Sequence, residues 1–214
     1  MSPEHWPKIL FFALLVRPFV TLVLGLNLRG HEHLRAMRSG IVVANHNSHL
    51  DTLVLMSLFP LRRLPRIHPM AAADYFFRNP ALKWIATRLI GILPVDRGGY
   101  GRATLRSARD ALRRGDILIL FPEGTRGKPE QLSTLKKGVA HIAALQPESP
   151  VLPIHIHGLG RALPRGEALL VPMICDIAVQ QPRRMLDFSG KDRDALMDWL
   201  QTSLSGASGN GHSR

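Results

Sequence analysis

The chain alternates short apolar segments with longer segments in which apolar residues recur every three to four positions. A continuous apolar run predicts a buried strand, and the three-to-four spacing predicts an amphipathic helix. The helix expected over 103–114 is the clearest, because its apolar positions keep the helical period and Gly115 follows its end. The other expected strands are 41–44, 67–73, 91–95, 116–121, 151–157 and 169–179, and the other expected helices are 31–37, 49–58, 75–90, 135–146 and 192–204. This alternation predicts one α/β layered domain, with a largely parallel central sheet flanked by helices.

The N-terminal segment contains two apolar runs, 9–16 and 19–26, separated by Arg17 and Pro18. A spanning helix needs about 20 predominantly apolar residues. An arginine near the centre of a span costs roughly 2.5–3.5 kcal/mol, and proline kinks or breaks a helix. We therefore expect two short helices lying in one leaflet, with Trp6, Lys8 and Arg17 at the level of the headgroups. The alternative is a pair of helices buried in the core.

These patterns divide the chain into three parts. Residues 1–27 are expected to be membrane-associating helices and 28–204 the α/β domain. Residues 205–214 are rich in Gly and Ser and are expected to be a disordered tail.

The charge balance points to an anionic partner. The chain has 28 Lys and Arg against 16 Asp and Glu, a net charge of +12. Because no helix-turn-helix or RNP-like pattern is present, a membrane surface and phosphate-bearing substrates are favoured over nucleic acid. Cys175 is the single cysteine, so no intrachain disulfide can form, as suits a reducing compartment. No metal site and no cofactor are expected, since no thiolate set or third histidine ligand accompanies His155 and His157.

A polar cluster, Asn45-His46-Asn47-Ser48-His49-Leu50-Asp51, follows the expected strand 41–44. His46 and Asp51 are separated by roughly 140° on a regular helix, so they meet only if His46 precedes the helix and Asp51 lies in its first turn. Ser48 as the N-cap residue allows that arrangement. The imidazole then folds onto the carboxylate, as in a His–Asp general-base pair. The alternative is a plain capping box, in which Asp51 only closes the helix start.

Four blocks together resemble a known family. Asn45-His46-x-Ser48-x-x-Asp51 resembles the first signature of the glycerolipid acyltransferases, the family of 1-acylglycerol-3-phosphate acyltransferases. The segments similar to the later signatures follow in the family's order: Gly91-Ile92-Leu93-Pro94-Val95-Asp96-Arg97, then Phe121-Pro122-Glu123-Gly124-Thr125-Arg126 with Lys136-Lys137-Gly138 behind it, then Val151-Leu152-Pro153-Ile154. The matching stretch runs from about residue 28 to about residue 158.

The resemblance implies an O-acyltransferase without a cofactor. The implied reaction transfers an acyl group from acyl-CoA or acyl-carrier protein to the free hydroxyl of 1-acylglycerol 3-phosphate, giving phosphatidic acid at the cytoplasmic face of the cell membrane. Alternative acceptors are a lyso-aminolipid, another lysophospholipid or glycerol 3-phosphate. A non-catalytic lipid-binding protein of the same fold is a further alternative, although such a protein has no need of a base.

Within that resemblance, His46 is the general base and Asp51 holds its tautomer. Arg97 and Arg126 each follow an expected strand, and in a parallel sheet they project at the same edge as His46, where they suit a phosphate. The remaining expected substrate-binding residues are Glu123, Gly124, Thr125 and Lys137. Gly124 permits close approach of the backbone to a ligand. Two alternatives stay open: Glu123 holds the acceptor hydroxyl or orients an arginine, and Lys136 and Lys137 bind phosphate or the thioester carrier or are solvated.

Overall fold

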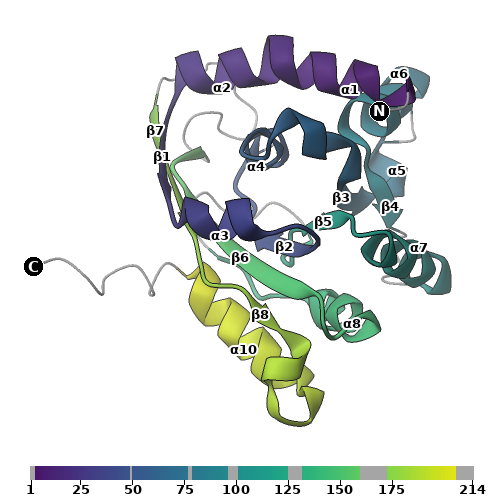
Figure 1. Cartoon of the computed structure of the whole chain (residues 1–214), viewed down its shortest axis with the longest axis vertical. Helices are drawn as coiled ribbons and strands as arrows, with labels where there is room; N and C mark the ends of the chain where they lie inside the picture. Colours follow the sequence, from purple (N-terminus) through teal and green to yellow (C-terminus); the bar gives the residue numbers. More distant parts are fainter. Residues whose placement is uncertain are drawn as a thin grey trace, which may run out of the picture.

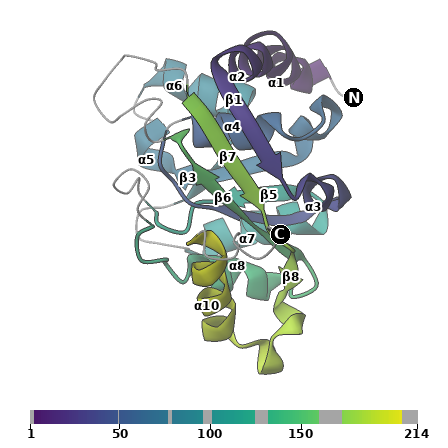
Figure 2. The ribbon, with the colours of Figure 1, turned by 90° about the vertical axis from the view of Figure 1, so that its left-hand side faces the viewer.

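A twisted sheet forms the centre of the molecule (Figures 1 and 2). The computed structural model describes residues 3–48, 50–76, 79–95, 101–124, 132–159 and 173–205. Within these ranges eight strands pair in the order β1-β7-β6-β2-β5-β3-β4, with β8 pairing to β6. Their bounds are β1 Leu24–Arg29, β2 Gly40–Ala44, β3 Ile67–Ala72, β4 Leu93–Val95, β5 Ile117–Leu120, β6 Pro150–His157, β7 Met173–Val179 and β8 Arg183–Arg184.

The middle of the sheet is parallel, as predicted. Strands β6, β2, β5, β3 and β4 run in one direction. Strands β7 and β1 are parallel to each other and antiparallel to β6. Helices connect most of these strands: α3 His31–Ala36, α4 Asp51–Ser57, α5 Ala73–Phe76, α6 Pro80–Trp84, α7 Arg102–Arg113, α8 Gly138–Leu145 and α10 Arg193–Leu204. Shorter helical segments are η1 Pro3–His5, η3 Leu61–Arg66, η4 Ile85–Ile90, η5 Met185–Asp187 and η6 Ser189–Lys191.

Two cores lie on opposite faces of the sheet because side chains alternate along each strand. Val42, Ile119 and Ile154 point to one face, where they pack with the N-terminal helix and α4. Ile41 and Leu118 point to the other face, where they pack with α7, α8 and α10. Figure 1 shows the resulting three layers, with the N-terminal helix at the top and α10 at the bottom. Cys175 is buried in the first core, as a small apolar residue would be.

The N-terminal segment is one continuous helix, so the prediction of two helices broken at Arg17 and Pro18 is wrong. It comprises α1 Trp6–Phe11, a π-helical turn η2 Phe12–Val16 and α2 Arg17–Val23. In the π turn the Arg17 N–H bonds to the carbonyl of Phe12, five residues back. This wider turn accommodates Pro18, whose ring would clash with the preceding turn of a regular α-helix.

The second apolar run also ends differently from the prediction. Residues from Leu24 leave the helix and form β1, which pairs in register with β7 from Leu24↔Met173 to Arg29↔Ala178. The expected boundary after residue 27 therefore falls inside a strand of the sheet. Residues 206–214 of the expected disordered tail lie outside the described residues.

One face of the N-terminal helix is part of the core. Ile9, Phe12, Val16 and Val20 are buried along it. Leu10, Leu14, Leu15 and Leu22 on its other sides are exposed. The helix from Trp6 to Val23 is long and apolar enough to cross a membrane, and 28% of that stretch is buried. It therefore combines features of both sequence alternatives, a core helix and a surface apolar helix.

Candidate active site

Two polar segments meet where neighbouring strands end. Strand β2 ends at Ala44 and strand β5 ends at Leu120, and the two strands pair in parallel. Their carboxyl ends therefore lie side by side at one edge of the sheet, where α/β proteins place their ligands. Asn45–Asp51 follows β2, and 121–124 follows β5.

His46 and Asp51 are joined by a hydrogen bond. The Nδ1 atom of His46 lies 2.8 Å from Oδ2 of Asp51, whose side chain is fully buried. The His46 side chain keeps 19% exposure. Because Asp51 is the first residue of α4 and His46 precedes that helix, the two side chains meet although they are five positions apart. Contact with Asp51 at Nδ1 leaves Nε2 of His46 for a substrate.

Asp51 also organises the loop that carries His46. Its Oδ2 atom accepts the backbone N–H groups of Asn47 at 2.6 Å and Ser48 at 2.8 Å. The prediction that Ser48 is the N-cap of the helix is wrong, because Leu50 is the N-cap residue and α4 begins at Asp51. The Ser48 hydroxyl accepts a hydrogen bond from the Leu50 N–H at 3.3 Å. Asp51 thus accepts backbone N–H groups of the loop before the helix and contacts the imidazole at the same time.

Two asparagines fix this loop to strand β6. Asn45 donates from Nδ2 to the Ile156 carbonyl at 2.8 Å and accepts the Ile156 N–H at 2.7 Å. Asn47 donates to the same carbonyl at 3.0 Å. Both side chains are buried, so these bonds are shielded from competing water. They hold the backbone on either side of His46 in one position.

Glu123 connects the two polar segments. Its Oε1 atom accepts the backbone N–H of His46 at 2.8 Å, and its Oε2 atom accepts the N–H of Ser133 at 3.0 Å. The residue is buried, at 4% exposure. Phe121 of the same segment stacks on the His46 imidazole, with ring centroids 4.2 Å apart and planes 24° apart. The sequence did not single out Phe121, although its place directly after β5 was a usable signal.

The two lysines of the Lys136-Lys137-Gly138 block point to different surroundings. Gly124 has φ 73°, and a Cβ on it would lie 2.5 Å from the Nζ atom of Lys136. Lys136 therefore occupies the space beside Gly124. Lys137 instead forms an exposed ion pair with Asp194 of α10, with Nζ and Oδ1 2.7 Å apart. That contact raises the pKa of Lys137 and lowers the pKa of Asp194.

Arg97, Thr125 and Arg126 lie outside the described residues. The strands before them are described, and both β4 and β5 run parallel to β2. Strand β5 is next to β2, whereas β4 is three strands away, roughly 14 Å at the usual spacing. The segments carrying the two arginines therefore start at the same edge of the sheet as His46, with Arg126 starting nearer to it.

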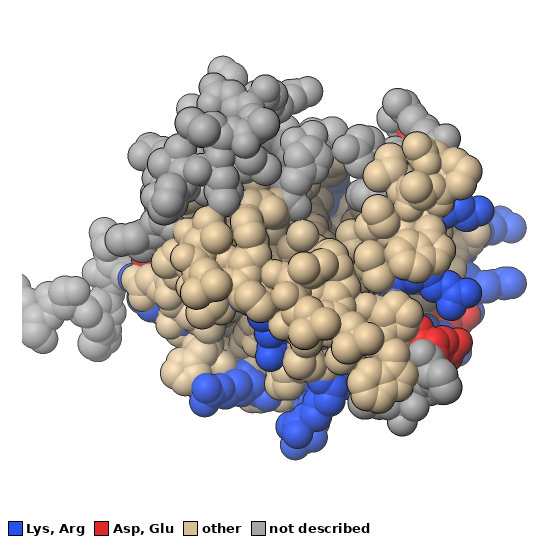
Figure 3. Space-filling model, turned by 90° about the horizontal axis from the view of Figure 1, so that it is seen from above, with Lys and Arg blue, Asp and Glu red and all other residues tan. Residues whose placement is uncertain are grey.

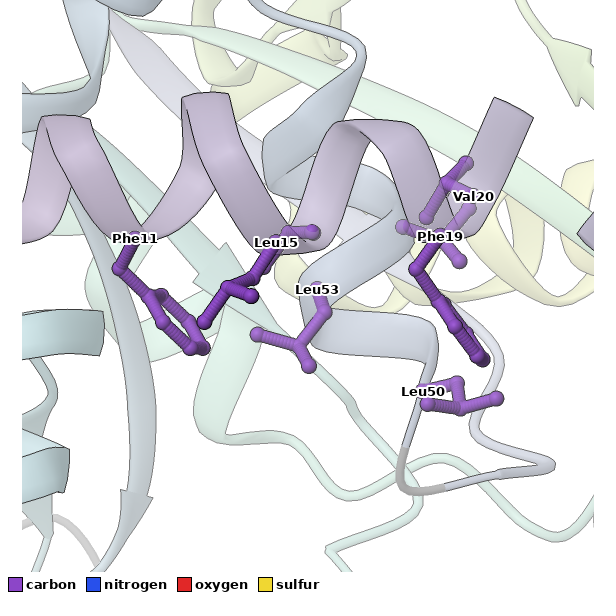
Figure 4. A pocket seen from close by; sticks show the side chains of 8 residues that line it. Phe11, Leu15, Phe19, Val20, Leu50 and Leu53 are labelled. Atoms are coloured by element: carbon purple, nitrogen blue, oxygen red, sulfur yellow. The ribbon is translucent and has the colours of Figure 1, made fainter. Parts of the chain in front are cut away.

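An apolar pocket of about 270 Å³ lies between the N-terminal helix and α4. Figure 4 shows Phe11 and Phe19 reaching from the N-terminal helix toward Leu50 and Leu53. The other lining residues are Leu15, Val16, Val20 and Val54. Leu50 adjoins Asp51 in the chain, so the helix that carries the carboxylate also forms a wall of the pocket. Leu15 is 62% exposed, which places one rim of the pocket at the molecular surface.

A second polar cluster lies at the amino edge of the sheet, away from His46. Lys8 donates to the Ile67 carbonyl at 2.8 Å. The Nε2 atom of His68 lies 3.6 Å from Asp116, and Asp116 also forms an ion pair with Arg114 at 3.0 Å.

The prediction that Lys8 lies at headgroup level is wrong, because Lys8 is 4% exposed. Burial lowers the pKa of Lys8 to about 7, partly offset by the charge of Asp116. Burial, with the nearby Lys8 charge, also lowers the pKa of His68.

The described ranges contain no group of three or more His, Cys, Asp or Glu residues placed to hold a metal ion.

A sequence model of the Acyltransferase family matches residues 25–157, more than half of the chain. This chain belongs to the Acyltransferase family. The matched region includes most of β1, both polar segments at the β2–β5 edge and all of β6.

Named relatives share this acyltransferase sequence along much of its length. The chain is 28% identical to a chloroplastic 1-acyl-sn-glycerol-3-phosphate acyltransferase of Arabidopsis thaliana, over 76% of this chain and 43% of the relative. It is 28% identical to the alpha 1-acyl-sn-glycerol-3-phosphate acyltransferase of Mus musculus, over 82% of this chain and 61% of the relative. The chain thus spans about half the length of these relatives.

A bacterial relative is closer in length, and a solved structure has the same fold. The 1-acyl-sn-glycerol-3-phosphate acyltransferase of Bacillus subtilis is 27% identical, over 87% of this chain and 89% of the relative. The crystal structure of the 1-acyl-sn-glycerophosphate (LPA) acyltransferase PlsC of Thermotoga maritima superposes with a TM-score of 0.76 at 22% identity, covering all of this chain and 84% of the other. The acyltransferase shares with it the α/β fold described above.

Proposed function

We propose that this acyltransferase transfers an acyl group from acyl-CoA or acyl-carrier protein to the free hydroxyl of 1-acylglycerol 3-phosphate, giving phosphatidic acid. The observation that carries the proposal is the hydrogen bond between His46 Nδ1 and Asp51 Oδ2 at the carboxyl edge of the sheet, in a chain of the Acyltransferase family. The names of the relatives support this acceptor.

In the proposed mechanism His46 is the general base. Its Nε2 takes the proton from the acceptor hydroxyl while the hydroxyl oxygen attacks the thioester carbonyl carbon. The tetrahedral intermediate then collapses, the C–S bond breaks, and the leaving thiolate takes the proton back from the imidazolium. Asp51 keeps the proton on Nδ1 and stabilises the imidazolium as it forms.

The supporting residues divide between positioning and binding. Glu123 fixes the backbone of His46, and Phe121 holds the plane of its ring, so both are positioning residues. Arg97 and Arg126 bind the acceptor phosphate in this proposal, because guanidinium groups pair with phosphate oxygens in a bidentate way. Thr125 and the backbone at Gly124 are proposed to contact the acceptor as well. Lys136 beside Gly124 contributes a further cation, and its position supports it over Lys137.

The apolar pocket takes the acyl chain in this proposal. Its volume of about 270 Å³ is near the lower end of small-molecule sites, and all of its lining residues are apolar. In this proposal the N-terminal helix lies at the cytoplasmic face of the cell membrane. The exposed apolar surface of Leu10, Leu14 and Leu22 supports its contact with a membrane. Lipid substrates then reach the pocket from the leaflet.

The test is a labelled acyl-transfer assay on the purified protein with a panel of acceptors and both donor types. We expect phosphatidic acid from 1-acylglycerol 3-phosphate, at a kcat/KM above that for lyso-aminolipids, other lysophospholipids and glycerol 3-phosphate. A higher kcat/KM for one of those acceptors would identify it as the substrate and leave the proposed acyl-transfer mechanism unchanged. No transfer to any acceptor from either donor, with folded protein in detergent, contradicts the proposed reaction.

A further inference from the structure

Large exposed apolar side chains are concentrated on two helical elements. The described ranges contain nine of them, and five lie on the N-terminal helix: Trp6, Leu10, Leu14, Leu15 and Leu22. Three more lie on α6 and the π-helical turn η4 Ile85–Ile90 that continues it: Leu82, Trp84 and Ile85. Leu186 is the ninth and lies elsewhere. Soluble surfaces normally scatter such residues singly, so this concentration indicates a contact surface.

The two elements are neighbours in space. Helix α1 packs against η4, and Gly91, which ends η4, lies against the Nζ atom of buried Lys8. In Figures 1 and 2 the N-terminal helix and α6 lie at the same upper end of the molecule. Helix α6 begins firmly, with Pro80 in its first turn and the Asn79 side chain accepting the Ala81 N–H at 2.8 Å. The exposed side chains of α6 therefore stand on an ordered element beside the N-terminal helix.

The charges around this surface are mostly positive. Neither 5–31 nor 79–95 contains an Asp or Glu, whereas Lys83 and Arg88 are exposed on α6 and η4. Figure 3 shows this end of the molecule as a broad, largely uncharged area, with Lys and Arg along much of its edge and a few Asp or Glu at one side. An apolar area bordered by cations matches a leaflet with anionic headgroups, where tryptophan is favoured at the boundary between headgroups and acyl chains.

We propose that α6 and η4 are a second membrane-contacting element, which inserts Leu82, Trp84 and Ile85 into the leaflet that holds the N-terminal helix. Lys83 and Arg88 lie among its anionic headgroups. One helix in a leaflet leaves the domain free to turn about the helix axis, whereas a second contact beside it fixes that rotation. The rim of the apolar pocket at Leu15 then faces the lipid. The inference rests on the proposed membrane association of the N-terminal helix.

Single-tryptophan variants of the full chain test insertion directly. The chain has three tryptophans, Trp6, Trp84 and Trp199. Each is kept in turn while the other two are changed to Phe, and fluorescence is measured with phosphatidylcholine–phosphatidylglycerol vesicles whose acyl chains carry bromine. We expect Trp84 to be quenched and blue-shifted like Trp6, and Trp199 of α10 to be unaffected. Quenching of Trp6 without quenching of Trp84 overturns the inference and leaves the N-terminal association standing.

A partition measurement supplies the second readout. In Leu82→Ser/Trp84→Ser/Ile85→Ser we expect binding to the same vesicles to fall at least about tenfold. Leu186→Ser, an equally exposed leucine on η5, is the matched control and should bind like wild type. Transfer activity in detergent should be retained by both variants, which shows that they are folded. Wild-type binding by the triple variant, together with an unquenched Trp84 in the single-tryptophan protein, overturns the inference. Failure of every variant and of wild type to bind vesicles removes the proposed membrane association itself.

Discussion

The carboxylate of Glu123 accepts the backbone N–H of His46 at 2.8 Å, across 77 positions of the chain. This bond ties the segment after β5 to the segment after β2. The second carboxylate oxygen accepts the Ser133 N–H, so both oxygens are engaged with backbone. The sequence left two alternatives for Glu123, holding the acceptor hydroxyl or orienting an arginine. These backbone contacts favour a third role, the positioning of His46.

Replacing Glu123 with glutamine should therefore slow turnover without weakening acceptor binding. Glutamine offers one acceptor atom where two N–H groups need partners, and hydrogen bonds to a charged group are worth about 1.5–3 kcal/mol. We expect kcat to fall about tenfold or more and the acceptor KM to stay near wild type. Glu148→Gln, at an exposed glutamate, is the matched control. A large rise in acceptor KM with unchanged kcat would instead place the acceptor hydroxyl on Glu123.

Removing the imidazole of His46 should abolish most of the activity. Loss of a general base costs about 10²–10⁴ in rate. His46→Ala should therefore lose that much kcat while keeping its fold, and Asp51→Asn in the same background should cost little more because the pair acts as a unit. Steady-state transfer assays with circular dichroism check both points, with the exposed His31→Ala as control. Turnover within a few fold of wild type in folded His46→Ala would exclude the base assignment.

The two arginines should affect the acceptor more than the donor. Arg97→Ala and Arg126→Ala each remove a charge-assisted contact of about 1.5–3 kcal/mol, so kcat/KM for the acceptor should fall about tenfold or more. Arg→Lys at the same positions should restore only part of the lost kcat/KM, because lysine keeps the charge but lacks the planar guanidinium that binds phosphate in a bidentate way. Arg35→Ala on α3, at the opposite edge of the sheet, is the control. Unchanged acceptor kinetics in both alanine variants would mean that other cations bind the phosphate.

A larger side chain at Leu53 should shift the acyl-chain preference. Leu53→Phe fills part of the 270 Å³ pocket, and one methylene in such a pocket changes discrimination about tenfold or more. We expect kcat/KM for long acyl-CoA to fall relative to short acyl-CoA, and Leu53→Ala to shift the profile the other way. Leu22→Phe, at a position 84% exposed on the same surface but outside the pocket, is the control. An equal loss at every chain length would indicate damage to α4 rather than an acyl site.

Stability should depend on pH through Lys8. Its pKa is about 7 in the folded chain against 10.5 when exposed, so between these values the unfolded chain binds the proton and the folded chain does not. The free energy of unfolding therefore gains up to about 1.4 kcal/mol per pH unit as pH rises from about 7 to 10.5, and this contribution is lost as pH falls. Burial, with the nearby Lys8 charge, lowers the pKa of His68, so that imidazole is neutral over the same window.

Urea unfolding at a series of pH values measures this dependence. The stability of Lys8→Met relative to wild type should fall as pH rises, because the variant lacks the gain. Lys191→Met, at an exposed lysine, should follow the wild-type slope. Parallel slopes for wild type and Lys8→Met would show that Lys8 stays charged in the folded chain.

The sequence by itself determined the features that depend on neighbouring residues. The spacing of apolar residues and the positions of Gly and Pro located most strands and helices. The alternation of strands with helices predicted the largely parallel α/β sheet. The meeting of His46 with Asp51 was also within reach, because it depends on six consecutive positions around a helix start. The order of the four sequence blocks led to the Acyltransferase family, which the family match confirms.

Only the tertiary structure decided features that depend on partners far along the chain. No residue in the apolar run 19–26 signals that the helix ends before Leu24. Strand β1 begins there because the backbone of Met173–Val179 pairs with it. Lys8 lies in a stretch that looks like a surface anchor, yet the Ile67 carbonyl and the Asp116 charge hold it inside. Lys136 and Lys137 are adjacent in sequence, and Asp194 of α10 directs one of them away from Gly124. In each case a local pattern fixes which conformations a segment can adopt, and the register of the sheet and the packing of distant helices select among them.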